Sequence, residues 1–274
     1  MSLVSSNDII KLLDLKRFGF LSKVISSLIL KVTRLSDVNK HYNKNKDLSC
    51  EEFIDAYLSE YNITYRLPKK DLENIPESGA FVNVSNYPFG GIEGLILLKI
   101  FKEIRPDYKL IADFMIQRFE PLSDSVINVN SFDKNKRISN LGGLKESIFY
   151  LRKGMSFGVF PAKGVSDVRF GDRYIDKEWN DSIICLIQKA KVPVVPLYFH
   201  GKNSRLFYRL SRLHPLLQWA KLPSELFNKK NKVIEVRIGK PISVLKQNKF
   251  IDLLEYKAYL RKKTYQLSKT ILEK

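Results

Sequence analysis

Short apolar runs alternate with amphipathic stretches over most of the chain, and this alternation predicts its secondary structure. Strands are expected where apolar residues run together between turn-forming residues, at 80–84, 125–129, 156–160, 192–199 and 233–239. Helices are expected where apolar residues recur at helical spacing, at 51–58, 91–101, 141–152, 181–190 and from about 253 onward. Ser49 followed three residues later by Glu52 has the spacing of a capping box at the first of these helices. The repeated strand-then-helix order indicates an α/β fold, with a mostly parallel central sheet flanked by helices.

The N-terminal region carries an amphipathic segment flanked by lysine and arginine. Its apolar residues recur at helical spacing, at Phe18, Leu21, Ile25, Leu28 and Val32. Two interpretations stay open. The helix lies in a membrane interface, where the lysines meet lipid phosphate, or it packs on the core of the domain.

Two further expectations concern the first third of the chain. The polar run 39–47, which contains His41, predicts a solvated loop. The change from basic, helical sequence to the alternation of strands and helices predicts a boundary near residue 75. We therefore expect an N-terminal helical region at 1–75, the candidate for membrane contact, and an α/β domain at 76–274.

Composition and charge narrow the class of partner. The chain has 274 residues, 44% hydrophobic content and a formal net charge of +18, which suits one sizeable domain that binds an anionic surface, either nucleic acid or a membrane. The start at Met1 lacks the basic region of a signal peptide, and no apolar run reaches membrane-spanning length, so we expect an intracellular, peripheral protein. Cys50 and Cys185 are far apart in sequence and indicate neither a metal cluster nor a disulfide framework.

Four sequence blocks in a fixed order carry a family resemblance. The first, Asn86 to Gly94, reads Asn-Tyr-Pro-Phe-Gly-Gly-Ile-Glu-Gly. The others are 119–122, 160–166 and 192–204, and Gly-Lys-Pro-Ile follows at 239–242. In this order, between about residues 80 and 242, they resemble the PlsC-like glycerolipid acyltransferases, and especially the branch known as hemolysin-like. The resemblance implies the fold of that family.

The chain departs from the family at three chemically demanding positions. The family has a histidine where this chain has Tyr87 and an aspartate where it has Glu93. In the third block, Gly164 stands where the hemolysin-like branch has its glutamate, and Lys163 stands at the glycine before it. The family's histidine acts as general base on the acceptor hydroxyl, whereas a phenol has a pKa of about 10, which would have to fall by roughly 2–3 to do the same at neutral pH. This pattern indicates a fold that is kept and a reaction that is lost or exchanged.

The candidate catalytic residues are Tyr87, Glu93 and His200. For Tyr87 three roles stay open: packing, binding of an anionic head group, and catalysis by the phenol. His200, at the end of a predicted strand, is either a replacement base or a supporting surface residue. The resemblance further implies a substrate-binding set, at Asn86, Gly90, Gly91, Arg118, Phe160, Pro161, Lys163, Gly164 and Ser166.

Two members of this set have a second interpretation. Lys163, with Arg118 and Arg169, is placed to hold a phosphate, but an exposed lysine is equally expected in so basic a chain. Ser166 is a nucleophile only if a base lies beside it, and the sequence supplies none.

The resemblance implies a function at the membrane. The chain would move a fatty acyl group from a thioester of acyl carrier protein or coenzyme A to the hydroxyl of a lysophospholipid or lyso-aminolipid. It would do so on the cytoplasmic face of the inner membrane, with anionic lipid as partner and without a metal or bound cofactor. The competing hypothesis is a catalytically inactive relative that binds lipid or a protein partner. Nucleic acid binding is not expected, because no helix-turn-helix, RRM or zinc pattern is visible.

Overall fold

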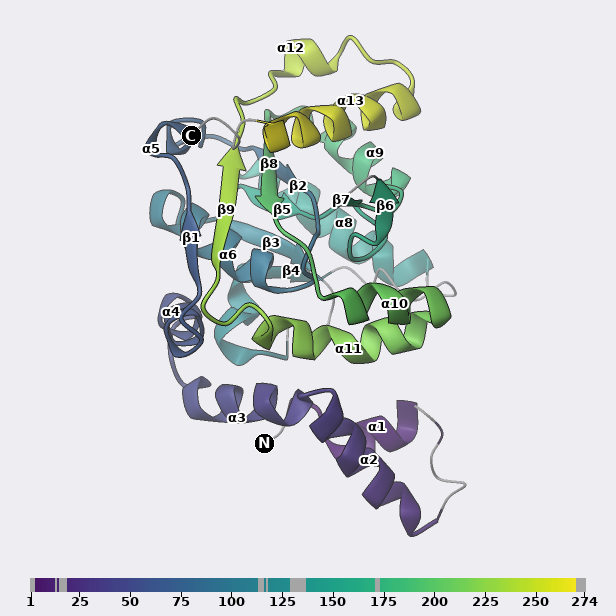
Figure 1. Ribbon diagram of the computed structural model, residues 1–274. Helices are drawn as coiled ribbons and strands as arrows, with labels where there is room; N and C mark the ends of the chain where they lie inside the picture. Colours follow the sequence, from purple (N-terminus) through teal and green to yellow (C-terminus); the bar gives the residue numbers. More distant parts are fainter. Residues whose placement is uncertain are drawn as a thin grey trace.

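The computed structural model describes residues 3–12, 14, 19–112, 116, 118–128, 137–170 and 173–269. In this part of the chain, seven strands form one sheet in the order β1-β9-β8-β2-β5-β3-β4. Every neighbouring pair is parallel except β8 and β9, which run antiparallel. The predicted α/β fold with a mostly parallel sheet is therefore confirmed (Figure 1). The strands span Thr64–Arg66 (β1), Val82–Ser85 (β2), Lys109–Ala112 (β3), Val126–Asn128 (β4), Phe157–Val159 (β5), Val194–His200 (β8) and Val233–Ile238 (β9).

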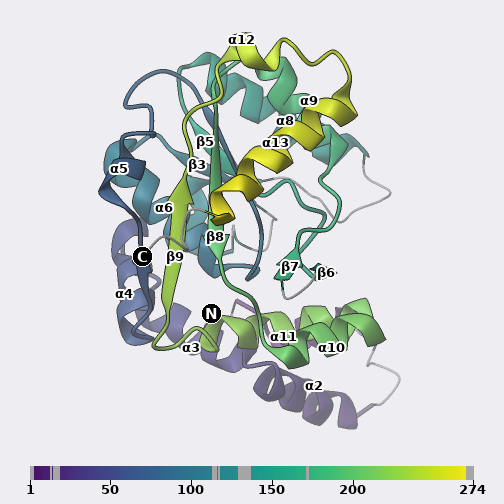
Figure 2. The same cartoon turned by 45° about the horizontal axis from the view of Figure 1, so that its top comes forward.

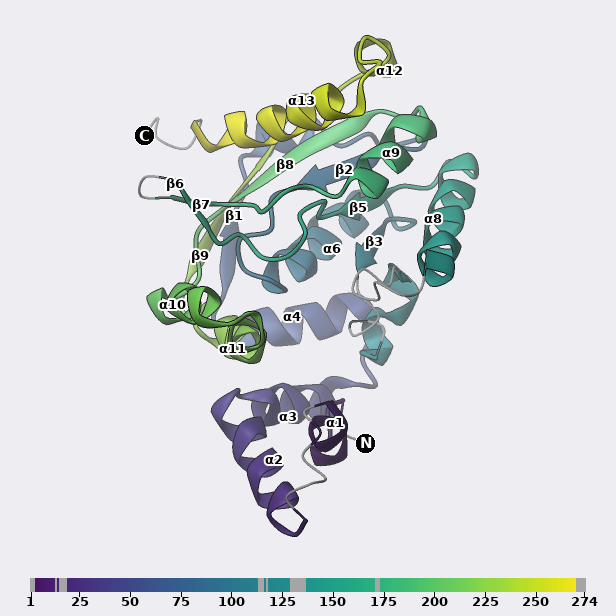
Figure 3. The same cartoon turned by 90° about the vertical axis from the view of Figure 1, so that its right-hand side faces the viewer.

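Helices cover both faces of the sheet (Figure 3). On one face lie α4 (Cys50–Glu60) and α6 (Ile92–Ile104), and on the other lie α8 (Arg137–Arg152), α9 (Asp181–Ala190) and α13 (Leu253–Gln266). The remaining elements are α1 (Ser6–Leu12), α2 (Leu21–Val32), α3 (Leu35–Asn45), α5 (Lys69–Leu72), η2 (Glu120–Ser125), the ribbon β6 (Val168–Phe170) and β7 (Arg173–Ile175), α10 (Arg205–Leu213), α11 (Pro215–Phe227), α12 (Val244–Gln247) and η3 (Leu267–Lys269). The predicted strands and helices all appear, with ends that differ by a few residues.

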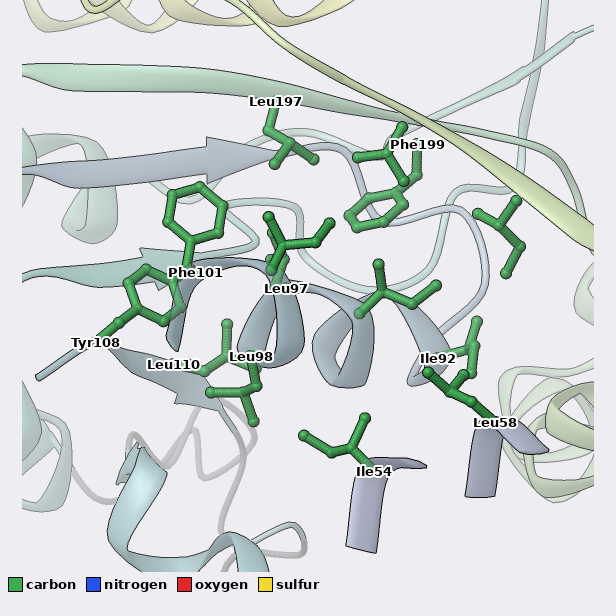
Figure 4. Close-up of a cluster of buried hydrophobic side chains, with 14 of the residues drawn as sticks. Ile54, Leu58, Ile92, Leu97, Leu98, Phe101, Tyr108, Leu110, Leu197 and Phe199 are labelled. Atoms are coloured by element: carbon green, nitrogen blue, oxygen red, sulfur yellow. The ribbon is translucent and has the colours of Figure 1, made fainter. Parts of the chain in front are cut away.

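Helix α6 is buried on two sides, which explains why most of its residues are apolar. Leu97 and Phe101 pack toward the strand residues Leu197 and Phe199, while Ile54 of α4 covers the opposite side of the helix (Figure 4). A helix enclosed in this way needs no polar face over most of its length. Because α6 begins within the Asn86 block, at Ile92, this packing fixes that block at the end of β2.

The segment from α4 to β1 shares the core of the sheet. Ile54 and Leu58 of α4 are buried in the same cluster as α6 and β8, and β1 pairs with β9 along Thr64 to Arg66. The boundary near residue 75 stays a prediction. The hydrophobic core itself extends into the N-terminal region, through α4 to Tyr42 of α3 and to Leu3.

The expected loop at 39–47 is wrong, because α3 runs through it to Asn45. His41 is 5% exposed, and its ring contacts the rings of Phe53 and Tyr57 on α4. Its Nδ1 lies 3.1 Å from Oε2 of Glu60, while burial lowers the pKa of His41. The polar run has only a weak intrinsic tendency to form a helix. Packing against aromatic side chains of α4 stabilises the helix nonetheless.

The amphipathic N-terminal segment is a helix, but its faces differ from the expectation. Ile25 was expected on the membrane-facing side, and it packs inward on Ile9 and Ile10 of α1. Phe18 lies outside the described residues. The exposed apolar residues of α2 are 55–72% exposed and are Leu21, Val24, Leu28 and Val32. The outward apolar stripe therefore contains Leu21, Leu28 and Val32 as predicted, with Val24 in place of Ile25.

We expect the cap of α4 to contribute measurably to stability. The hydroxyl of Ser49 accepts a hydrogen bond from the N–H of Glu52, and the predicted capping box is confirmed. Ser49→Ala should lower the free energy of unfolding by about 1 kcal/mol. Ser59→Ala, an exposed position inside the same helix, serves as the matched control and should change it by less than about 0.5 kcal/mol in urea unfolding. Equal effects of the two substitutions would contradict the role of the cap.

Candidate functional site

The turn between β2 and α6 is closed by the side chain of Glu93. One carboxylate oxygen accepts hydrogen bonds from the N–H groups of Phe89 (2.9 Å) and Gly90 (2.8 Å), and the other from Gly91 (2.9 Å). These N–H groups stand at the start of a helix, where amides lack partners within the helix and the dipole favours negative charge. Burial raises the pKa of Glu93, and the three backbone hydrogen bonds oppose that rise. Glu93 thus points back into its own turn.

Two glycines let α11 rest on this turn. Gly90 has a φ of +91°, and a Cβ there would lie 2.5 Å from Leu222 and 2.7 Å from Val165. A Cβ on Gly91 would lie 3.0 Å from Leu226. Both positions therefore need glycine for close contact with the helix above, and Gly90 also needs it for its backbone conformation.

Asn86 ties the turn to the neighbouring strand. Its Nδ2 donates to the carbonyl of Phe199 (2.9 Å), and its Oδ1 accepts from the N–H of the same residue (2.8 Å). Asn86 is 3% exposed, so its amide satisfies buried backbone groups at the end of β8. In this structure its side chain acts as a clamp between two strands.

Tyr87 lies where the turn meets the third sequence block. Its N–H donates to Asp176 (3.0 Å) and its carbonyl accepts from the N–H of Ser166 (2.8 Å). The ring stacks at a tilt on Phe160, with centroids 4.8 Å apart. The structure therefore brings Tyr87, Phe160 and Ser166 together.

Asp176 is the centre of this arrangement, and nothing in the sequence identified it. Its carboxylate accepts from the hydroxyl of Ser166 (2.5 Å), the N–H of Tyr87 (3.0 Å) and the indole of Trp179 (2.9 Å). Burial raises the pKa of Asp176, and these hydrogen bonds together with the charge of Arg261 oppose the rise. Asp176 is 1% exposed and joins two loops that are far apart in sequence.

Pro161 and Lys163 of the third block make their described contacts with other segments. The carbonyl of Pro161 accepts from the N–H of Asn180 (2.8 Å), and Nζ of Lys163 lies 2.8 Å from a carboxylate oxygen of Glu178. Lys163 and Lys257 lower the pKa of Glu178 to about 2. Gly164 has a φ of +119° with open space beside it. Lys163 is thus already engaged in an exposed ion pair.

Arg118, one of the two cations expected beside Lys163, lies elsewhere. The guanidinium of Arg118 donates to the carbonyl of Leu3 (3.1 Å), and its charge helps to lower the pKa of Asp8. Arg118 therefore contacts the N-terminal segment. The side chain of Arg169 lies outside the described part of the chain.

His200 stands at a cavity on the other side of Phe89. Its ring meets that of Tyr198 edge to face, 4.6 Å away, which places the two on the same face of β8. The cavity has a volume of about 460 Å³ and is lined by His200, Phe89, Lys229 and, among others, Lys202 and Lys232. The described contacts of His200 are thus with other residues than those of Tyr87 and Glu93. These contacts do not join the three residues into a catalytic triad.

Lys229 is the buried cation of this cavity. Its Nζ donates to Oδ1 of Asn203 (2.8 Å) and lies 4.9 Å from the ring centroid of Phe89. Burial lowers the pKa of Lys229, and the carboxylates of Glu225 and Glu93 oppose that effect. Lys229 was not predicted from the sequence, because it belongs to a segment without a recognisable motif.

Comparison with known proteins places this site in a family. A family model described as acyltransferase matches residues 19–273. The chain belongs to this acyltransferase family. The predicted resemblance to the PlsC-like acyltransferases, and to their aminolipid branch, is therefore confirmed.

Relatives and a solved structure agree with the family. The chain is 26% identical over 266 residues to a lyso-glycine lipid O-acyltransferase of Bacteroides thetaiotaomicron, covering 92% of this chain and 93% of the relative. It is 25% identical over 254 residues to the enzyme of that name in Phocaeicola vulgatus, covering 88% and 86%. The crystal structure of PlsC, a 1-acyl-sn-glycerophosphate acyltransferase of Thermotoga maritima, is 17% identical and covers 98% of this chain and 99% of its own, with a TM-score of 0.51. This likeness shows the fold.

We expect the Glu93 carboxylate to stabilise the turn in this acyltransferase-family chain. Glu93→Gln keeps the volume but puts an NH₂ group against backbone donors, so at least one buried N–H loses its acceptor. The free energy of unfolding should fall by about 1–3 kcal/mol, as measured in urea.

The matched control is Glu103→Gln, because Glu103 lies on the same helix with its side chain 62% exposed. That change should cost less than about 0.5 kcal/mol. If the two variants are equally stable, the carboxylate is not what closes the turn.

Proposed function

We propose that this protein transfers a fatty acyl group from a thioester to the hydroxyl of a lysolipid, with a lyso-aminolipid as the preferred acceptor. The family match over residues 19–273 carries the proposal, and the two relatives named for lyso-glycine lipid support the acceptor class. Acyl carrier protein or coenzyme A supplies the thioester. The reaction needs no metal and no bound cofactor, because the acyl group is already activated.

The proposed reaction needs few catalytic groups from the protein. The acceptor oxygen attacks the thioester carbonyl carbon, the carbon–sulfur bond breaks, and the hydroxyl proton ends on the departing thiol. A base that takes this proton while the new bond forms contributes typically 10²- to 10⁴-fold. Tyr87 stands at the position of the family's base, at the end of β2, with its ring against Phe160.

Glu93 has a structural role in the proposed reaction. The N–H groups of Phe89, Gly90 and Gly91 are bonded to its carboxylate and so do not serve an oxyanion in the reaction. Asp176 holds the backbone of Tyr87 and the hydroxyl of Ser166, which makes it a positioning residue. In this proposal the phenol of Tyr87 is the group that takes the hydroxyl proton, as the histidine does in the family.

We place the reaction on a membrane surface, on the cytoplasmic face of the inner membrane. The exposed stripe Leu21, Val24, Leu28 and Val32 is apolar, and exposed lysines stand beside it at Lys23 and Lys31. This combination suits a helix that lies in the interface of an anionic bilayer. None of the helices in the described part of the chain has the length and apolar character needed to cross a membrane.

A second function is favoured by one observation. Glu93 accepts three backbone hydrogen bonds, and none of them comes from Tyr87, so these two residues do not reproduce a base and its orienting acid. An inactive relative that binds lysolipid without turnover would have the same scaffold. Activity measurements separate the two.

The membrane placement predicts a loss of binding in one variant. Each large aliphatic side chain moved from water to an apolar phase contributes about 1.5–3 kcal/mol, so Leu21→Ser, Val24→Ser and Leu28→Ser together should weaken binding to phosphatidylcholine vesicles containing phosphatidylglycerol by roughly tenfold or more. Sedimentation with vesicles measures this, and added salt should weaken the wild type because it screens the lysines. A triple variant that sediments like the wild type refutes the interfacial role of α2.

The chemistry predicts an ordered series of rates. Ester formation from acyl carrier protein or coenzyme A thioesters is followed by mass spectrometry, with lyso-glycine lipid and lysophosphatidate as acceptors. Tyr87→Phe keeps the ring on Phe160 and should lower kcat by about 10²- to 10⁴-fold, whereas Tyr87→His, alone or with Glu93→Asp, should retain or raise it.

The stability of each variant is the control for this series. If Tyr87→Phe is as active as the wild type, the phenol is not the base. If neither the wild type nor Tyr87→His forms ester while both bind lysolipid, the protein is a lipid-binding relative.

A further inference from the structure

The hairpin of α10 and α11 covers the Tyr87 turn with its inner face. Phe207 and Tyr208 of α10 are buried beside Val165, and Tyr87 packs against this cluster. Leu222 and Leu226 of α11 are the side chains that approach Gly90 and Gly91 most closely. Anything that reaches the turn from this side must pass the hairpin.

The hairpin is closed at its base. Both carboxylate oxygens of Glu225, near the end of α11, accept hydrogen bonds from Ser204, which precedes α10: one from its N–H (2.9 Å) and one from its hydroxyl (2.6 Å). The ring of Tyr208 stacks on Tyr174 of β7, and Gln218 donates to Asp167 (3.1 Å). The two helices are thus one unit, fastened at its base and resting on the loops of the site.

The outer face of the same hairpin combines apolar and cationic side chains. Four large apolar residues are 43–73% exposed, namely Leu206, Leu213, Leu217 and Trp219. Beside them are three exposed arginines, which form no ion pair with any described residue, namely Arg205, Arg209 and Arg212. Exposed leucine, tryptophan and arginine side chains are typical of elements that lie in a membrane interface.

The position of the hairpin matches that of α2. Both lie at the same end of the molecule, opposite α12 and α13 (Figures 1 and 2). The guanidinium of Arg34, at the start of α3, lies 4.1 Å from the ring centroid of Phe227 at the end of α11. A bilayer at this end would meet the apolar stripe of α2 and the hairpin together.

We propose that the outer face of the α10–α11 hairpin docks on an anionic lipid surface, so that the hairpin lies between the bilayer and the Tyr87 turn. An acidic protein such as acyl carrier protein would satisfy the arginines but would leave the leucines and Trp219 in contact with solvent. The docking does not rest on the proposed function.

Trp219 reports docking directly. The chain has two tryptophans, and Trp179 is fully buried, so vesicles should act on the fluorescence of Trp219 alone. Vesicles of phosphatidylcholine with phosphatidylglycerol should shift the emission to the blue, and brominated phosphatidylcholine should quench it. Trp219→Phe should abolish both responses. If the emission of Trp219 does not change with vesicles but shifts with acyl carrier protein that carries no acyl group, the surface binds an acidic protein. That outcome overturns the proposal.

Surface variants provide the second test. Each arginine near an anionic lipid surface is worth about fivefold in binding, so replacing Arg205, Arg209 and Arg212 with glutamine should weaken vesicle binding by about 100-fold. Replacing Leu206, Leu213 and Leu217 with serine should remove the quenching of Trp219.

The matched control lies at the opposite end of the molecule. Leu245, Ile251 and Leu254 are 60–96% exposed, and their triple serine variant should bind vesicles like the wild type. Equal losses in the two serine variants would overturn the proposal. None of these measurements needs turnover, so a protein that docks but forms no ester refutes the proposed function and leaves the docking surface in place.

Discussion

A carboxylate buried at the start of a helix is stable only where backbone N–H groups surround it, and the site of this protein is organised around one such group. Glu93 draws the amides of Phe89, Gly90 and Gly91 around its two oxygens. That contact sets the path of the turn from β2 into α6. The path of the turn decides where the ring of Tyr87 lies and which surface α11 covers. The extra methylene of glutamate relative to aspartate lets the side chain curl back into its own turn, and here it has changed the role of the position.

A second buried carboxylate organises the neighbouring loops. Asp176 binds the backbone of Tyr87, the hydroxyl of Ser166 and the indole of Trp179, so three chain segments converge on one side chain. Buried charges of this kind favour a single arrangement, because moving any donor away leaves the carboxylate unsatisfied. Tyr87 is therefore held through its main chain as well as by the contact of its ring with Phe160.

Sequence patterns predicted the parts of this structure that depend on local sequence and failed where distant contacts decide. The apolar runs of β2 and β8, the helix α6 and the cap at Ser49 follow from period and spacing, and they are present. His41 was placed in a loop because its neighbours are polar, whereas aromatic rings of another helix enclose it. Asp176 carried no signal, since its partners are far away in the chain. The inward turn of Ile25 depends on α1, which the pattern of α2 alone does not reveal.

The pairing of the first strand has a consequence for how the protein is made. β1 has a single neighbour in the sheet, β9, and the residues that pair, such as Arg66 and Glu235, are separated by 169 positions. During synthesis the ribosome has released most of the chain before that neighbour exists. The apolar face of α4 belongs to the same core, so until β9 emerges the first quarter of the nascent protein has an incomplete fold. Such non-local closure is slow and leaves apolar surface exposed to aggregation, which makes a chaperone or an early membrane contact useful at this stage.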